Sequence, residues 1–205
     1  MNQCQENMLT DFFIKNVWAS VGVWLLLSIS DSLLTVKGAR MYQKGVKEHF
    51  DFSGSIELEP AHQEEIDRFQ AISFRYVLEL VLYGGLLWIV HYCGLAKLFS
   101  VMWGGLVLLQ LAIHLRHFHN LILFRYASRS IGIEGHIKYA RWLVLRLSSI
   151  EIFGFGLMYS IAYLFSESLV ILGGAVACLL ISLRHLLLSK GKAAKVSQMP
   201  SNEPV

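Results

Sequence analysis

Five long apolar segments alternate with polar connections along this chain, at residues 17–36, 71–92, 98–124, 142–164 and 169–188. A helix needs about 20 mostly apolar residues to cross the hydrocarbon core of a bilayer, and each segment reaches that length. Helices in the core of a soluble protein would show polar faces at helical spacing, whereas these runs are apolar all round. The pattern therefore predicts an all-α polytopic membrane bundle of five transmembrane helices.

The composition agrees with a membrane protein. Hydrophobic residues make up 55% of the chain and charged residues 16%, and the mean hydropathy is +0.50. Soluble domains carry about 25% charged residues, so an ordinary globular, disordered or collagen-like chain is excluded. The net charge of +3 fits basic loops near anionic lipid head groups, and we expect no nucleic-acid partner.

Lysine and arginine are unevenly distributed between the two sides of the predicted bundle. One side holds the N-terminus and the connections near residues 94–97 and 166–168, and it carries only Lys15 and Lys97. The opposite side holds the 37–70 loop, the 125–141 loop and the C-terminal tail. Basic residues gather in cytoplasmic loops, so we expect the N-terminus outside and the C-terminus in the cytoplasm of a cell with an inner membrane. The basic residues on the second side are Lys37, Arg40, Lys44, Lys47, Arg68, Arg125, Arg129, Lys138, Arg141, Lys190, Lys192 and Lys195.

The pattern predicts one bundle domain over residues 1–188 and a polar, disordered cytoplasmic tail over 189–205. The first span lacks a positive n-region and is expected to stay in the mature protein. In the cytoplasmic loop 37–70, basic residues at helical spacing predict a continuation of the first helix. After a break at residues 51–60, the acidic stretch 61–70 is interpreted as a short helix. We favour solvation of the polar side chains in this loop, with cation binding as the alternative; these residues are Glu57, Glu59, His62, Glu64, Glu65 and Asp67.

The second and third spans resemble the fourth and fifth at an offset of about 70 residues. We favour a duplicated helical hairpin that follows a single first helix, with chance similarity between apolar helices as the alternative. Glycine pairs inside the spans are expected to allow close helix contacts. The matching positions are Arg75, Glu79 and Gly85 with Arg146, Glu151 and Gly156, and Gly104-Gly105 and Arg116-His117 with Gly173-Gly174 and Arg184-His185.

Ionisable residues within the spans lie almost entirely in the predicted cytoplasmic half. An ionisable side chain at the centre of a bilayer costs about 2.5–3.5 kcal/mol, so such residues are candidates for function. Their one-sided placement predicts a shared polar layer or a cavity that opens to the cytoplasm. The candidates are Asp31, Arg75, Glu79, His114, Arg116, His117, Arg146, Glu151, Arg184 and His185.

Several chemistries fit this layer. Histidine and carboxylate groups could relay protons, and the arginines could hold an anion. His114 and His117, three apart, are the weak metal candidates, so we expect no cofactor, with a divalent metal as the alternative. Paired Arg and Glu side chains that only fix the hairpins are an equally good interpretation. No catalytic residue can be assigned, since no GxSxG, nucleotide-binding or zinc motif occurs.

The depth of each ionisable residue in the membrane predicts which side chains of this layer form pairs. Glu79 and Arg116 lie at about equal depth, some 12 Å from the cytoplasmic ends of their spans at 1.5 Å per residue. Because an unpaired charge at that depth is costly, we expect Glu79 to pair with Arg116 and Glu151 with Arg184, directly or through one water. Arg75 and Arg146 would then lie nearer the head groups.

Three short motifs follow one another along the chain: Asp31 with Thr35, then IELEP at residues 56–60, then RHFHN at the end of a later span. In this order they resemble uncharacterised bacterial multi-pass membrane proteins that carry an ELNP-like turn. Glu59 stands where such a turn has Asn. The resemblance implies an inner-membrane location and no particular activity.

The sequence leaves three functions open. The first is binding or translocation of a small ion or anion through the polar layer, in a homo-oligomer within the lipid bilayer. The second is a membrane-embedded enzyme that acts on lipid head groups, with His117 or His185 as acid or base. The third is a structural or assembly subunit of a larger membrane complex, without chemistry.

Overall fold

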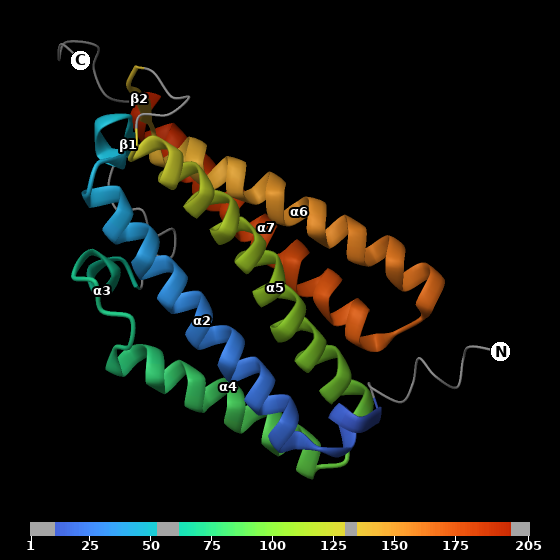
Figure 1. The fold of residues 1–205 in the computed structure, drawn as a ribbon. Coiled ribbons are helices and arrows are strands. Elements are labelled where there is room, and N and C mark those ends of the chain that lie inside the picture. The colour runs from blue at the N-terminus through green and yellow to red at the C-terminus, as the bar shows by residue number, and fades with distance from the viewer. Residues whose placement is uncertain (1–10, 53–61, 130–134, 198–205) are drawn as a thin grey trace.

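The computed structural model describes residues 11–52, 62–129 and 135–197, the last six of these by their backbone alone. Five long helices form the bundle: α2 (Val17–Gln43), α4 (Phe74–Tyr92), α5 (Ala96–Ala127), α6 (Arg141–Ser166) and α7 (Leu169–Ser197) (Figure 1). Each is long and apolar enough to cross a membrane. The predicted all-α polytopic bundle with five spanning helices is confirmed.

Local sequence explains where several helices begin and end. The Asn16 side chain accepts a hydrogen bond from the Ala19 amide at the start of α2, and the Ser73 hydroxyl accepts one from the Tyr76 amide at the start of α4. Asn and Ser are favoured at this position because they satisfy amides that have no partner inside the helix. Gly94 turns the chain between α4 and α5 at φ 72°, and Glu167 turns it between α6 and α7 at φ 53°.

The predicted boundaries differ from the observed ones mainly at the end of the chain. α7 continues to Ser197, although the sequence predicts a disordered tail from residue 189. Lys and Ala, which dominate residues 190–195, are good helix formers and extend the helix. Residues 198–205, and the IELEP stretch that carries the family resemblance, lie outside the described residues.

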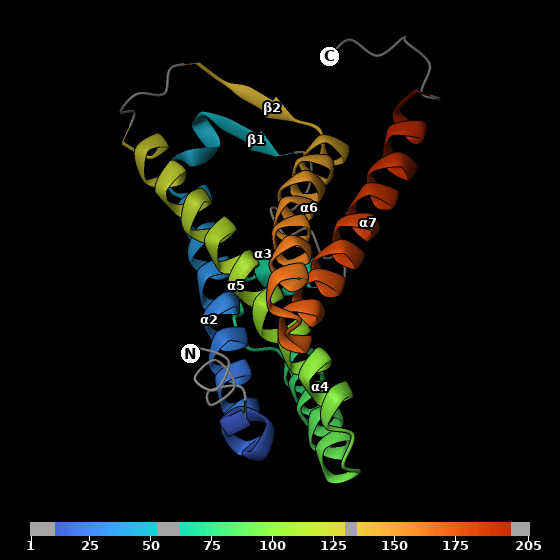
Figure 2. The same cartoon turned by 90° about the vertical axis from the view of Figure 1, so that its right-hand side faces the viewer.

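The first helix continues past its predicted apolar segment, as its basic spacing indicates, and is followed by the 3₁₀ turn η1 (Val46–Glu48). Two short strands, β1 (Phe50–Phe52) and β2 (Ile137–Tyr139), then pair in parallel with Phe50 opposite Ile137 and Phe52 opposite Tyr139. They tie the loop after α2 to the loop before α6. We call the end of the bundle that carries these strands the capped end (Figure 2).

Glycine brings α5 and α7 into close contact. A Cβ atom on Gly104 would collide with the backbone of Val170, and one on Gly173 would collide with the backbone of Val101. The contact is reciprocal, as a two-fold relation between the helices would produce. However, α6 packs closely along α7, whereas α4 and α5 contact each other far less. The hairpins are therefore packed differently, and the duplication stays a prediction.

Apolar clusters divide the bundle along its length. Away from the capped end, Trp24, Leu87, Phe99 and Trp103 form a buried core between α2, α4 and α5. At the capped end, Tyr42, Phe50 and Phe124 belong to a second buried cluster. The short helix α3 (Gln63–Asp67) packs Ile66 against Val36 and Ala39 of α2. Polar side chains lie between these two ends.

Candidate functional site

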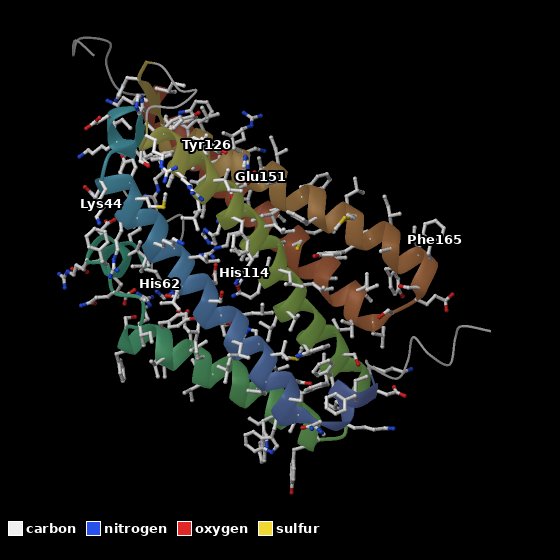
Figure 3. The ribbon with its side chains drawn as sticks, viewed as in Figure 1. Lys44, His62, His114, Tyr126, Glu151 and Phe165 are labelled. Carbon is white, nitrogen blue, oxygen red and sulfur yellow. The ribbon has the colours of Figure 1, made fainter. Side chains whose placement is uncertain are left out.

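A pocket of about 340 Å³ lies between the apolar core and the capped end, and we call it the chamber. Segments from α2, α3, α4, α5, α6 and α7 line it. Figure 3 shows nitrogen and oxygen atoms gathered around His62 and His114 between these helices. The ionisable residues that line the chamber are Asp31, His62, Glu65, Glu79, Arg116, His117, Arg184 and His185.

In the chamber wall formed by α2 and α5, Asp31 contacts His117. His117 Nε2 lies 3.0 Å from Asp31 Oδ1 and 3.3 Å from Thr35 Oγ1. The Thr35 hydroxyl donates to the Asp31 carbonyl oxygen at 3.0 Å, so its oxygen accepts from the histidine. Nε2 of His117 therefore carries a proton and points toward the Asp31 carboxylate.

Behind this pair, polar atoms are buried without a hydrogen-bond partner. His114 is 7% exposed and donates from Nδ1 to the Gln110 carbonyl oxygen at 2.7 Å. Its Nε2 is therefore an acceptor, and it has no partner in the described chain. Gln110 Oε1 and the hydroxyls of Ser28 and Tyr76 also have no hydrogen-bond partner there. We call these four atoms the orphan atoms.

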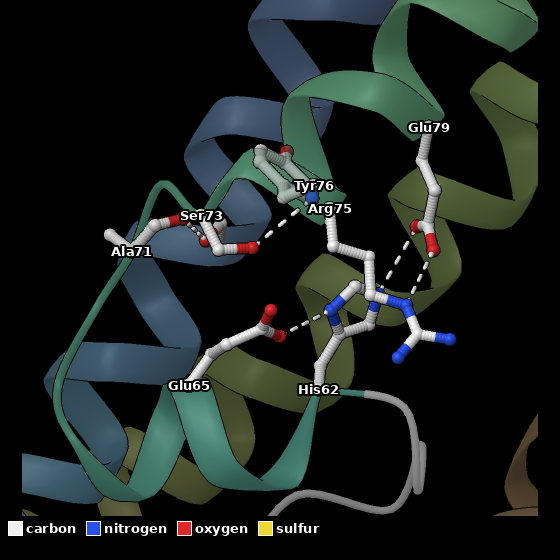
Figure 4. A network of polar contacts seen from close by, with 8 residues as sticks. His62, Glu65, Ala71, Ser73, Arg75, Tyr76 and Glu79 are labelled. Carbon is white, nitrogen blue, oxygen red and sulfur yellow. Dashed lines mark hydrogen bonds and ion pairs between the residues drawn. The ribbon is translucent and has the colours of Figure 1, made fainter.

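The α3–α4 wall contains a second histidine between two carboxylates (Figure 4). His62 Nδ1 lies 2.9 Å from Glu65, and His62 Nε2 lies 3.1 Å from Glu79, which also contacts Arg75 at 4.0 Å. Both ring nitrogens face carboxylate oxygens, and this arrangement suits a protonated imidazole.

Electrostatics agree with that assignment. Burial alone would lower the pKa of His62, but the hydrogen bond to Glu65 and the charge of Glu79 outweigh it, so the pKa is raised. The hydrogen bond from His62 lowers the pKa of Glu65. Both shifts favour the charged forms of the two groups.

On the opposite wall, hydroxyl groups connect α5, α6 and α7. Arg116 donates to Ser148 Oγ, and the Ser148 hydroxyl is also hydrogen-bonded to His185 Nδ1 at 3.0 Å. Ser149 and Ser182 bond each other's backbone carbonyl oxygens at 2.8 Å. Such hydrogen bonds between helices hold polar residues inside a membrane bundle.

The structure brings many of the predicted residues together, but not all of them. Glu151 lines a separate groove and contacts His119 at 3.9 Å. His114 lies behind the chamber wall, Arg75 lies at its edge, and Arg146 is exposed on α6. The predicted residues that do line the chamber are Asp31, Glu79, Arg116, His117, Arg184 and His185.

The predicted pairs Glu79–Arg116 and Glu151–Arg184 are not in direct contact among the described residues, and pairing through one water stays a prediction. Glu79 lines the chamber together with Arg116, but its ion pairs are with His62 and Arg75. Equal depth does not decide pairing, because α3 folds back beside α4 and places a histidine nearer to Glu79. Glu151 contacts His119 instead, because it faces the groove.

Sequence reasoning missed His62 and Glu65, which it interpreted as part of a solvated acidic stretch. The clustering of His and Glu in residues 61–70 was the available signal. Within the described residues, no three His, Cys, Asp or Glu side chains group as metal ligands. The chamber therefore offers proton-accepting oxygen and nitrogen atoms, charged histidine–carboxylate pairs and guanidinium groups.

No protein-family model matches this sequence, and neither curated proteins nor solved structures show a significant match to it. Function must therefore be inferred from the site. The five apolar helices make the chain an integral, multi-pass membrane protein.

Proposed function

We propose that this integral membrane protein binds a small monovalent cation, the proton included, in the chamber. The observation that carries the proposal is the chemistry of the orphan atoms. Gln110 Oε1 and His114 Nε2 are acceptors, two hydroxyls accompany them, and the Asp31 carboxylate lines the chamber. Buried acceptors without a donor are costly, so a ligand here must bring donors or positive charge.

An anion fits this part of the chamber less well. It would need donors, yet His117 directs its Nε2 proton toward Thr35 and Asp31, and Arg116 is turned to Ser148. The carboxylates of Asp31 and Glu79 would repel an anion, and they attract a cation. The described residues also lack a three-ligand metal group, which favours a proton or a monovalent ion over zinc.

The two histidine–carboxylate pairs support a proton as the ligand. His62 lies on the α3 wall and His117 on the α5 wall of the same chamber, each beside a carboxylate. The raised pKa of His62 favours proton uptake by that group from the solution. A proton that reaches Asp31 would then be held by the buried acceptors behind it.

The structure favours binding over free passage through the bundle. Beyond the chamber, Trp24, Leu87 and Phe99 close the space between α2, α4 and α5 with buried apolar side chains. An ion could cross that layer only after the helices separate. We therefore propose a binding site with access from the capped end.

The test measures thermal unfolding of the purified protein in mild detergent. Sodium, potassium, ammonium and choline chloride are compared at one ionic strength, and a pH series is recorded in choline chloride. A bound cation stabilises the folded state, so one of the small cations should raise the Tm above that in choline. If the proton is the ligand, the Tm instead changes with pH in the choline chloride series.

Asp31→Asn should remove the cation or pH effect, because it removes the charge at the site. Glu64→Gln is the matched control, since Glu64 lies on the surface of α3 with 78% of its side chain exposed and pairs with Arg68. Equal Tm values in all four salts, together with the same pH profile in the wild type and Asp31→Asn, would rule the proposal out.

A further inference from the structure

A second cavity adjoins the chamber. This groove, of about 370 Å³, lies between α2, α5 and α6 beneath β1 and β2, and it shares Thr35, Arg116 and His117 with the chamber. Its volume falls within the range of about 300–1,000 Å³ that is typical of small-molecule sites. More of its lining residues are apolar than in the chamber.

The groove has long apolar walls, and its lining also includes Arg141, the first residue of α6. Leu34, Leu121 and Val144 form its walls, and Phe50 and Phe52 of β1 close it at the capped end. The aromatic rings of Phe52 and Tyr139 stack there at 5.5 Å. An apolar cavity of this kind favours a hydrocarbon chain over a hydrated ion.

Arg116 and Ser148 mark the polar end of the groove. The guanidinium group donates to the Ser148 hydroxyl, and His117 and Asn120 line the same end. An arginine beside a hydroxyl suits a carboxylate, which can accept bidentate hydrogen bonds. Glu151 also lines this end and would repel a doubly charged phosphate more strongly than a singly charged carboxylate.

The groove opens sideways toward the lipid. α5 and α6 contact each other little, and Figure 2 shows them diverging toward the capped end. Leu147 and Ile150 of α6 line the opening and are 47% and 63% exposed. A molecule that is dissolved in the bilayer can therefore reach the groove between these helices.

We propose that the groove binds a single-chain fatty acid. Its carboxylate lies at Arg116 and Ser148, and its chain runs past Leu121 and Val144 toward the aromatic rings of β1. The site is separate from the proposed cation site, which depends on Asp31.

The experiment uses the full chain in phosphatidylcholine nanodiscs and the fluorescent fatty acid cis-parinaric acid, with its methyl ester as the uncharged probe. Hydrogen bonds to a charged group contribute about 1.5–3 kcal/mol, so the acid should bind about tenfold or more tightly than the ester. Arg116→Gln should abolish this difference and leave ester binding in place. Equal binding of the acid and the ester to the wild type would overturn the proposal.

Filling the groove gives a second readout. Val144→Trp should weaken binding of both probes about tenfold or more, because the indole occupies the space of the chain. Leu121→Trp fills the groove from the opposite wall and replaces Val144→Trp if that variant does not fold. Val176→Trp, on the exposed side of α7, is the control and should bind like the wild type.

Competition identifies the class of ligand. Laurate should displace the probe, whereas lauryl phosphate and a diacyl phosphatidylglycerol should displace it far less. Stronger displacement by either phosphate compound would overturn the fatty-acid assignment. Unchanged binding in folded Val144→Trp or Leu121→Trp would show that the probe sits in bulk lipid and would overturn the site itself. The cation test with Asp31→Asn is unaffected by either result.

Discussion

At the residue scale, two histidines stand beside carboxylates in different walls of the chamber. His117 contacts Asp31 from the neighbouring long helix, and His62 contacts Glu65 and Glu79 from α3 and α4. The second arrangement couples the folded position of α3 to protonation, because both nitrogens of the His62 ring face carboxylate oxygens.

Replacing His62 should make stability depend less on pH. Its pKa is raised above the ordinary value of 6.5 in the folded protein. The stabilisation is therefore full below pH 6.5 and is lost as the pH rises through the folded-state pKa. We expect the free energy of unfolding of the wild type to exceed that of His62→Gln by about 0.5–1 kcal/mol at low pH. For a chain of this length, each kcal/mol corresponds to a difference of about 2–4 °C in Tm.

The measurement is the Tm difference between the wild type and His62→Gln from pH 5.5 to pH 8.5. Glu65 does not disturb this window, because its pKa is lowered and its contribution is lost only as the pH falls through the folded-state value. A Tm difference that is constant over the series would contradict the proposed charge on His62.

At the element scale, the contact of α5 with α7 depends on glycine. Gly104 and Gly173 have no side chain where the backbone of the other helix passes. Small residues at such positions let helices in a membrane approach closely and gain van der Waals contact. The glycine pairs in the spans predicted this contact, and the structure confirms it for α5 and α7.

Gly104→Ala should destabilise the protein by about 1–3 kcal/mol or more, because the added methyl group collides with the Val170 backbone. Gly173→Ala should act in the same way through Val101. Gly154→Ala is the control, since nothing lies within 4 Å of its added Cβ, and alanine there should be neutral or stabilising. Thermal unfolding in detergent checks these expectations, and equal Tm values for Gly104→Ala and Gly154→Ala would refute the packing argument.

At the scale of the whole molecule, the capped end and the opposite end should lie on different sides of the membrane. The excess of lysine and arginine predicts that the capped end is cytoplasmic. This orientation stays a prediction, and two exposed positions allow it to be tested. Cys93 follows α4 at the end away from the cap, and Ser128 follows α5 at the capped end.

In a variant with Cys4 replaced by serine, a membrane-impermeant maleimide should label Cys93 in intact cells. Cys178 is fully buried and should stay unlabelled. A second variant in the same background carries both Cys93→Ser and Ser128→Cys. Its cysteine at position 128 should be labelled only after the cells are permeabilised. The reverse pattern would invert the predicted topology, and labelling of both positions in intact cells would contradict their placement on opposite sides.

The sequence by itself determined the five spanning helices and the end at which their polar residues gather. Lipid offers no hydrogen-bond partners, so each span must satisfy its backbone internally and remain apolar over its whole length. That requirement is local and can be read from consecutive residues. The boundaries at Tyr92 and Leu169 were predicted for this reason, and Asp31, Arg116 and His117 were identified as neighbours of one polar layer.

Only the tertiary structure decided which polar groups meet. The partner of Glu79 is His62 because α3 folds back beside α4, and no periodicity in residues 61–70 encodes that approach. The pairing of β1 with β2 joins loops that are far apart in the sequence. Side-chain partners depend on the rotation and tilt of whole helices and on the path of their loops. These follow from packing across the entire bundle and cannot be read from any single segment.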